Sequence, residues 1–147
     1  MSNVRTISLE SEFTVEAPLE RVFHAYCHEQ LDWYPHTYGG ERVRSVVFEP
    51  RVGGLTYEDW GDGAGHLYGH VSHFDPPNSL AVRSRLGAVL LDQTVSFRGE
   101  GDSTVVSART VTFGEISEEM EQGIRFHGDV GQYADLLRKW VEKVDEH

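Results

Sequence analysis

Alternation of apolar and polar positions marks the first structured segment of the chain. The odd positions from 7 to 15 carry Ile, Leu, Ser, Phe and Val, and the even positions between them are polar. This period of two predicts a half-buried strand. Pro18 suits the first turn of a helix, and apolar residues then recur at helical spacing, at Leu19, Val22, Phe23 and Tyr26. We expect a second short helix over 29–34, ending before Pro35.

Strand-like segments fill the middle of the chain, each closed by glycine, proline, aspartate or asparagine. We expect strands over 43–48, 55–60, 66–74, 80–86, 89–98 and 104–113. The glycine-rich run 61–65 lacks the spacing of phosphate-binding and calcium-binding loops, so we interpret it as a turn between strands. Connections this short predict antiparallel pairing.

The last segment has a one-sided apolar stripe at helical spacing, formed by Val130, Tyr133, Ala134, Leu137, Trp140, Val141 and Val144. It predicts a long amphipathic helix that lies on the sheet, and Ser117 is expected to cap a helix before it. The fold class is therefore α+β, with a curved antiparallel sheet of about six to seven strands around a long C-terminal helix and two short helices after the first strand. A sheet that curves around a helix leaves a cavity, and such cavities bind small apolar ligands.

The net charge limits the classes of partner, and the chain length limits the number of domains. The 147 residues include 24 acidic and 13 basic side chains, a formal net charge of -11. This charge repels phosphate backbones and anionic membranes, so we expect no nucleic-acid and no membrane partner. The length predicts a single domain over 1–147. A homodimer is left open.

Cysteine usage and the absence of targeting signals favour a cytoplasmic location. Cys27 is the only cysteine, so no intramolecular disulfide can form. Residues 1–10 lack the basic and apolar regions of a signal peptide, and no apolar stretch approaches the roughly 18 residues of a membrane span.

Several local motifs follow one another in the same order as the predicted elements. They are residues 15–23 with Trp33, then Val52-Gly53-Gly54, Gly69-His70-Val71, Asp75-Pro76-Pro77, and the helix residues Tyr133, Leu137 and Trp140. This combination resembles the START-like (SRPBCC) superfamily, and within it the branch of polyketide-cyclase-like proteins and homologues of the activator of the heat-shock-protein-90 ATPase. The resemblance implies the helix-grip fold with a hydrophobic cavity between the sheet and the long helix. It implies no single activity, because similar proteins carry lipids, cyclise polyketides or assist chaperones.

Aromatic and polar side chains around the expected cavity are the candidate ligand contacts. Aromatic rings with polar tips suit a ligand entrance, which we place at the cluster of Trp33, Tyr34, His36 and Tyr38. Core packing is the alternative for Trp33. The full set of predicted ligand-binding residues is Trp33, Tyr57, Trp60, Tyr68, His70, Gln93 and Phe126.

Three strand assignments leave alternatives open. Over 55–60, either the face of Leu55, Tyr57 and Asp59 or the face of Thr56, Glu58 and Trp60 lines the cavity. His66, Tyr68 and His70 share one face of a regular strand, which either lines the pocket or forms an exposed polar face. An inward Arg109 would anchor an anion, whereas the resemblance places Val106 and Ala108 inside instead.

Candidate chemistry for an enzyme rests on His70, Asp59 and Tyr57 as proton shuttles. A buried Asp59 or Glu58 would have a raised pKa and could act as a general base, although such carboxylates are more often exposed. We expect no metal and no cofactor, because His24 and His28 share a helical face but lack a third ligand.

Three functional hypotheses follow. The first is binding of a small apolar or aromatic molecule in the cavity. The second is a cofactor-free cyclase, dehydratase or hydrolase acting on a polyketide-like substrate. The third is a chaperone-assisting interaction module, which is less favoured because the chaperone activator has a further domain that this chain lacks.

Overall fold

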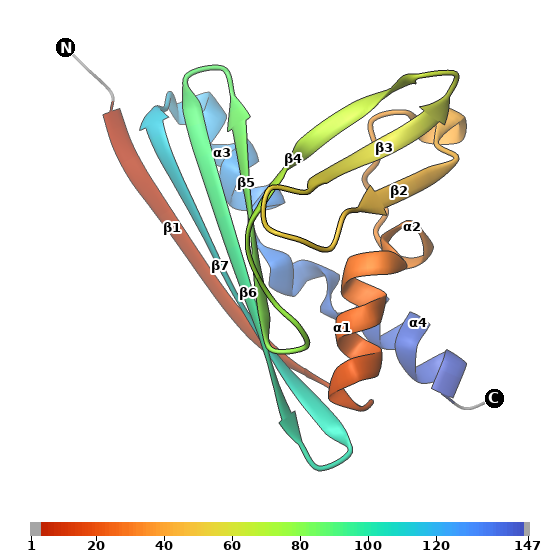
Figure 1. Cartoon of the computed structure of the whole chain (residues 1–147). Helices are drawn as coiled ribbons and strands as arrows, with labels where there is room; N and C mark the ends of the chain where they lie inside the picture. Colours follow the sequence, from red (N-terminus) through yellow and green to blue (C-terminus); the bar gives the residue numbers. More distant parts are fainter. Residues whose placement is uncertain (1–3, 146–147) are drawn as a thin grey trace.

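The protein consists of a large sheet with helices on one side, as seen in Figure 1. The computed structural model describes residues 4–145, and the side chains of 4–142. In chain order the elements are β1 (Val4–Val15), α1 (Leu19–His28), α2 (Gln30–Trp33), the 3-10 turn η1 (Gly40–Arg42), β2 (Ser45–Phe48), β3 (Leu55–Gly61), β4 (Ala64–Asp75), β5 (Ser79–Leu86), β6 (Val89–Glu100), β7 (Ser103–Glu115), α3 (Glu118–His127), the 3-10 turn η2 (Val130–Tyr133) and α4 (Ala134–Asp145).

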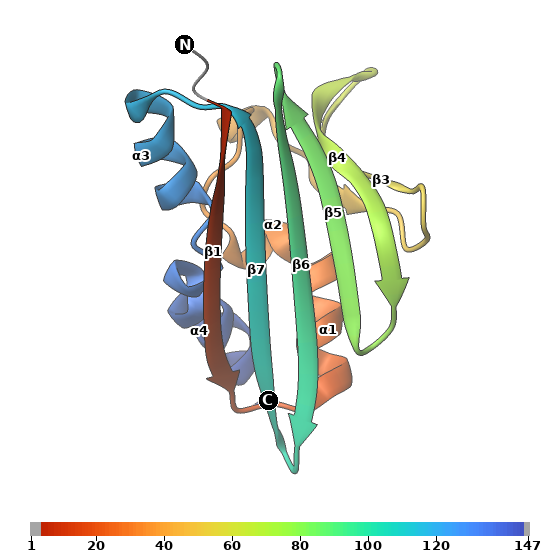
Figure 2. The same cartoon turned by 90° about the vertical axis from the view of Figure 1, so that its left-hand side faces the viewer.

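The strands form one seven-stranded antiparallel sheet in the order β1-β7-β6-β5-β4-β3-β2. The first strand pairs with the last along its whole length, from Val4 opposite Glu115 to Val15 opposite Thr104. Figure 2 shows the sheet from its other face, with α1, α2 and α4 behind it. The expected α+β fold, with two short helices after the first strand and a helix at the C-terminal end, is confirmed.

The inner face of β7 is the one that the resemblance implies. Val95 and Val106 are fully buried against the helices, and Ala108 is buried beside them. Arg109 points the other way, with 62% of its side chain exposed near Glu10. The inward placement of Val106 and Ala108 is therefore confirmed, and Arg109 is not a cavity residue.

The C-terminal helical region is divided more finely than the apolar stripe predicts. Residues 130–133 form the 3-10 turn η2, and the α-helix proper begins at Ala134. The buried stripe residues Tyr133, Leu137 and Val141 still face the sheet, while the side chain of Val144 lies outside the described residues.

A separate helix, α3, precedes this region and begins at the predicted cap. The Ser117 hydroxyl accepts the N–H of Met120 at 3.1 Å, which confirms the cap. The chain then turns at Gly128, where the backbone packs so closely on β1 and β7 that a Cβ would lie 2.9 Å from the Leu9 Cδ1 atom and 3.4 Å from the Thr110 Cγ2 atom. This turn separates α3 from the η2–α4 segment.

Apolar packing forms two clusters rather than one. The larger joins α1, α4 and the sheet around residues such as Phe23, Phe97 and Leu137. The smaller joins Ile7, Val89 and Ile116 near α3. None of the helices in residues 4–145 is long and apolar enough to cross a membrane.

Candidate functional site

A cavity of about 560 Å³ lies between the inner face of the sheet and the helical layer. Leu80 and Trp33 of the larger apolar cluster border it, as does Val89 of the smaller one. Helix α3 contributes Met120 and Ile124 to the wall. This volume is typical of small-molecule sites in proteins.

A chain of hydrogen bonds fixes the polar part of the sheet-side wall. The Tyr26 hydroxyl donates to the Gln93 Oε1 atom at 3.3 Å, and the Gln93 Nε2 atom donates to the Thr110 hydroxyl at 3.2 Å. Thr110 in turn donates to the Gly128 carbonyl at 3.0 Å. Burial raises the pKa of Tyr26, with smaller effects of Cys27 and Tyr34, so its phenol stays neutral and donates. The Tyr26, Gln93 and Thr110 side chains therefore already have hydrogen-bond partners within the protein.

Rings from three segments meet at another part of the wall. His36, which follows α2, lies with its ring centroid 5.8 Å from those of Tyr34, Tyr133 and His127. All four residues line the cavity. Phe126 packs on the outer side, 6.0 Å from His36 and 54% exposed. We call Tyr34, His36, His127 and Tyr133 the tyrosine–histidine cluster.

Tyr133 has an unusual position within this cluster. Its hydroxyl oxygen is buried and no hydrogen bond of normal geometry reaches it. The Tyr34 ring lies 4.9 Å away, and its phenol approaches the Tyr133 oxygen as a loose hydrogen-bond donor, which raises the pKa of Tyr34 and lowers that of Tyr133 against the larger effect of burial. Burial is the main cause that raises the pKa of both, so both are neutral at pH 7.

Glu58 is a fully buried carboxylate directly behind the wall. It accepts the backbone N–H of Tyr38 at 2.7 Å and of Gly39 at 2.9 Å, the Trp60 indole N–H at 3.0 Å, and the hydroxyl of Tyr68. Burial by itself raises the pKa of Glu58, but these donors outweigh it and hold the pKa below its ordinary value. Glu58 is therefore an ionised acceptor that ties the segment after α2 to the sheet.

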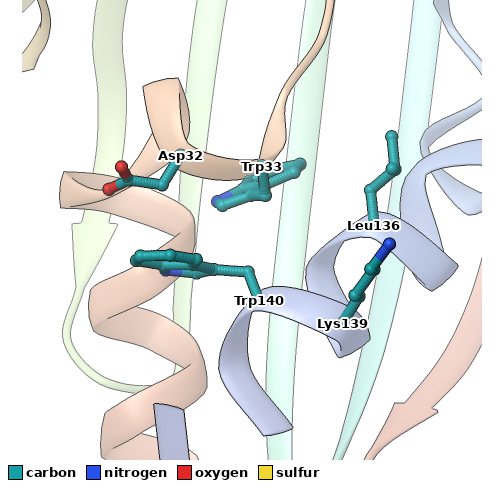
Figure 3. A pocket seen from close by; sticks show the side chains of 5 residues that line it. All are labelled: Asp32, Trp33, Leu136, Lys139 and Trp140. Carbon is teal, nitrogen blue, oxygen red and sulfur yellow. The ribbon is translucent and has the colours of Figure 1, made fainter. Parts of the chain in front are cut away.

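A smaller hollow of about 190 Å³ lies between α2 and α4, shown in Figure 3. Trp33 and Trp140 line it, with Asp32, Leu136 and Lys139 at its edge. Both indole N–H groups are already bonded, that of Trp33 to the Ala25 carbonyl at 3.0 Å and that of Trp140 to the Glu29 carboxylate at 2.7 Å. The hollow is too small and too poor in free donors to be the main site.

The fold of this chain is similar to that of several solved structures, whereas comparisons of its sequence find no match. No protein-family model matches the chain, and no curated protein matches it in sequence. A protein of unknown function from Rhizobium leguminosarum is similar in structure, with a TM-score of 0.66 and 22% identity over 97% of this chain and 99% of that one. Norcoclaurine synthase from Thalictrum flavum, in complex with dopamine and hydroxybenzaldehyde, has a TM-score of 0.64 and 19% identity over 96% of this chain and 89% of its own. CalU16 from Micromonospora echinospora has a TM-score of 0.59 and 20% identity over 94% and 76%.

This chain has the helix-grip fold. The order of its elements, the curved antiparallel sheet and the C-terminal helix agree with these neighbours over nearly the whole chain. At such identities the likeness concerns the fold, and the branch expected from the sequence stays a prediction.

Three of the seven predicted ligand contacts lie in the wall of the helix-grip cavity: Trp33, Tyr68 and Gln93. The expected entrance residues Tyr34, His36 and Tyr38 also line it, and Tyr38 is 66% exposed. Trp33 lies in the cavity wall and also belongs to the larger apolar cluster of the core.

His70 faces away from the cavity, against the prediction. The pairing of β3 with β4 shifts between Thr56 and Tyr57, so that Gly69 pairs with Thr56, Leu67 pairs with Tyr57, and Tyr68 is the extra residue. This bulge resets the alternation of β4, because two residues then oppose one on the partner strand. His66 and Tyr68 line the cavity, whereas His70 pairs with the outward Arg83 and is exposed.

Tyr57, Asp59, Trp60 and Phe126 are absent from the described cavity wall. Tyr57 and Asp59 alternate with the inward Thr56 and Glu58 and so face outward. Trp60 shares the inner face but is covered, since Arg42 lies over its ring at 4.3 Å. The suggested general-base role is wrong for Glu58, whose pKa is lowered rather than raised.

Two members of the tyrosine–histidine cluster carry no recognisable signal in the sequence. Tyr133 belongs to the apolar stripe and looks like any core residue, and His127 is the last residue of α3 and is part of no local motif. Within residues 4–145 no three His, Cys, Asp or Glu side chains are arranged to hold a metal ion. His24 and His28 pack ring to ring at 5.2 Å, and His24 pairs with Glu29 at 3.4 Å.

Proposed function

We propose that this helix-grip protein binds a small aromatic or apolar molecule in the 560 Å³ cavity. The observation that carries the proposal is the wall itself. Apolar side chains and aromatic rings make most of it, and a few polar groups converge at the tyrosine–histidine cluster. This combination gives a ligand both buried area and orientation. Norcoclaurine synthase, which shares the fold, forms a complex with dopamine and hydroxybenzaldehyde, two small molecules with aromatic rings.

The test compares the wild-type protein with a variant in which a larger side chain fills the cavity. Val82 on β5 lines the cavity, and Val111 on β7 points from the opposite face of the sheet. Native mass spectrometry with a panel of small aromatic compounds should give discrete mass increments for the wild type. Val82→Trp should weaken that binding about tenfold or more by occupying the space, whereas Val111→Trp should leave it unchanged. Increments that survive in Val82→Trp would place the ligand elsewhere.

A second candidate is cofactor-free acid–base catalysis on the bound molecule. The observation in its favour is His36, an imidazole in the cavity wall beside the phenols of Tyr34 and Tyr133. A histidine so placed can transfer protons near neutral pH. Turnover of polyketide-like substrates should then fall about 100-fold in His36→Gln and stay unchanged in His70→Gln. Equal rates in wild type and His36→Gln would remove this candidate.

A further inference from the structure

We propose that the tyrosine–histidine cluster anchors an acidic oxygen group of the ligand, a carboxylate or an acidic phenol carried on an aromatic ring. The inference rests on the proposed function, because it names the class of molecule that the same cavity takes. It assigns the polar end of that molecule to Tyr34, His36, His127 and Tyr133.

The charge of the wall differs from the charge of the protein. The chain carries 24 acidic residues and a net charge of -11. None of these acidic side chains is among the described residues that line the cavity, while Arg85 and three of the eight histidines, His36, His66 and His127, are. The described wall of this acidic protein therefore contains a guanidinium and imidazole groups but no carboxylate.

The carboxylates closest to the cluster in the fold do not alter this picture. Glu58 sits behind Tyr68 and is already saturated by its donors from the loop, the indole and the phenol. Asp129 acts on Tyr133 through charge, but it is exposed and outside the wall. A cationic ligand would therefore meet no free carboxylate in the cavity.

Tyr133 supplies the independent observation. Its residue surface is 6% exposed, and its hydroxyl has no partner at normal hydrogen-bond geometry, although the Tyr34 phenol approaches it as a donor. Buried polar atoms in folded proteins nearly always have a well-placed partner, so the proton of the Tyr133 hydroxyl is free to meet an acceptor that comes from outside. A neutral phenol has one proton to donate, and an anionic oxygen is the strongest acceptor for it.

The neighbouring groups complete a set of donors. The rings of Tyr34 and His127 each lie near that of His36, with centroids 5.8 Å away. Phenol O–H and imidazole N–H groups both donate to a carboxylate or phenolate oxygen, and the Arg85 guanidinium in the same cavity wall adds positive charge. Such a cluster favours an anionic ligand over a neutral one of the same shape, and disfavours a cation.

The experiment uses four naphthalene probes of similar shape: 2-naphthoate, 2-naphthol, 2-naphthamide and 2-naphthylmethylammonium. Isothermal titration at pH 7 should give an affinity for 2-naphthoate about tenfold above that for the amide, with the ammonium compound weakest. Since an ordinary phenol is neutral at pH 7, binding of 2-naphthol at the level of the amide supports an anionic oxygen as the preferred group, and binding at the level of naphthoate would show that charge is not needed and would overturn the anchor. Equal affinities for naphthoate and amide overturn the anchor and leave the proposed function standing. No binding of any probe overturns both.

Variants separate the anchor from general packing. His36→Phe and Tyr133→Phe keep a ring in place, and each should remove most of the preference for naphthoate while changing amide affinity less than about twofold. Because the Tyr133 hydroxyl has only the loose contact with Tyr34 to lose, Tyr133→Phe should also change the urea midpoint of unfolding little. His70→Phe, on the outer face, is the matched control and should bind as the wild type does. Equal losses for naphthoate and amide would show that the rings act only by packing.

Discussion

At the scale of single residues, hydrogen-bond partners decide what a buried acid does. Burial alone would raise the pKa of Glu58 and make it a base, but its donors reverse that effect. The partners come from Tyr38, Gly39, Trp60 and Tyr68, on two separate stretches of chain. No sequence pattern shows such a convergence, so a role assigned to Glu58 from its neighbours in sequence could not be right.

Replacing Glu58 by Gln should destabilise the fold by about 2–4 kcal/mol at pH 7, because an amide leaves buried donors unpaired. The lowered pKa of Glu58 means that its stabilisation is present above the ordinary carboxyl pKa and is lost as pH falls through the folded-state pKa. The difference between wild type and Glu58→Gln should therefore shrink at acidic pH. Urea unfolding at pH 7 and at acidic pH measures both effects.

The matched control is Asp59→Asn. Its side chain faces outward, and an Asn Oδ1 atom can still accept the Gly61 N–H that Asp59 accepts at 2.8 Å. This variant should change the free energy of unfolding by less than about 0.5 kcal/mol. A pH-independent loss in Glu58→Gln would contradict an ionised Glu58 in the folded protein.

At the scale of elements, regular strands were predictable and irregular ones were not. The inner face of β7, which alternation alone left open, is the one that the resemblance implies, and the pairing of β6 with β7 runs without a register shift from Leu90 opposite Phe113 to Glu100 opposite Ser103. In β4 alternation misplaced His70, since one extra residue at Tyr68 reverses the side chains up to a second register shift between Val71 and His73. A bulge depends on how two strands pair, and a single strand's pattern does not record it.

Helix α3 shows a second limit of sequence patterns. Its cap at Ser117 was predictable from local residue types, and its end at Gly128 depends on contact with Leu9 and Thr110. None of its side chains is buried, yet Met120 and Ile124 complete the cavity wall. The helix is tied to the sheet by Arg5, which bridges to Glu121 at 2.8 Å. Only the fold shows that this polar helix closes one end of a cavity.

At the scale of the whole molecule, the apolar interior is divided. The larger cluster and the smaller one are separated by the cavity, so the two halves of the sheet do not share one continuous core. An unfilled cavity lacks the packing contacts that stabilise a core. A ligand that fills it should therefore stabilise the complete fold and not only the residues it touches.

We expect 2-naphthoate to raise the melting temperature of the wild type. At a free concentration 100 times its Kd, a ligand that binds only the folded state adds about 2.7 kcal/mol, or roughly 5–10 °C for a chain of this size. Differential scanning calorimetry at several ligand concentrations measures the shift, which should grow with the logarithm of concentration. Val82→Trp should show little shift at the same concentrations, because its indole occupies the space, and Val111→Trp should follow the wild type. A shift of equal size in Val82→Trp would mean that the ligand stabilises the protein from its surface, and the cavity would then not be the site.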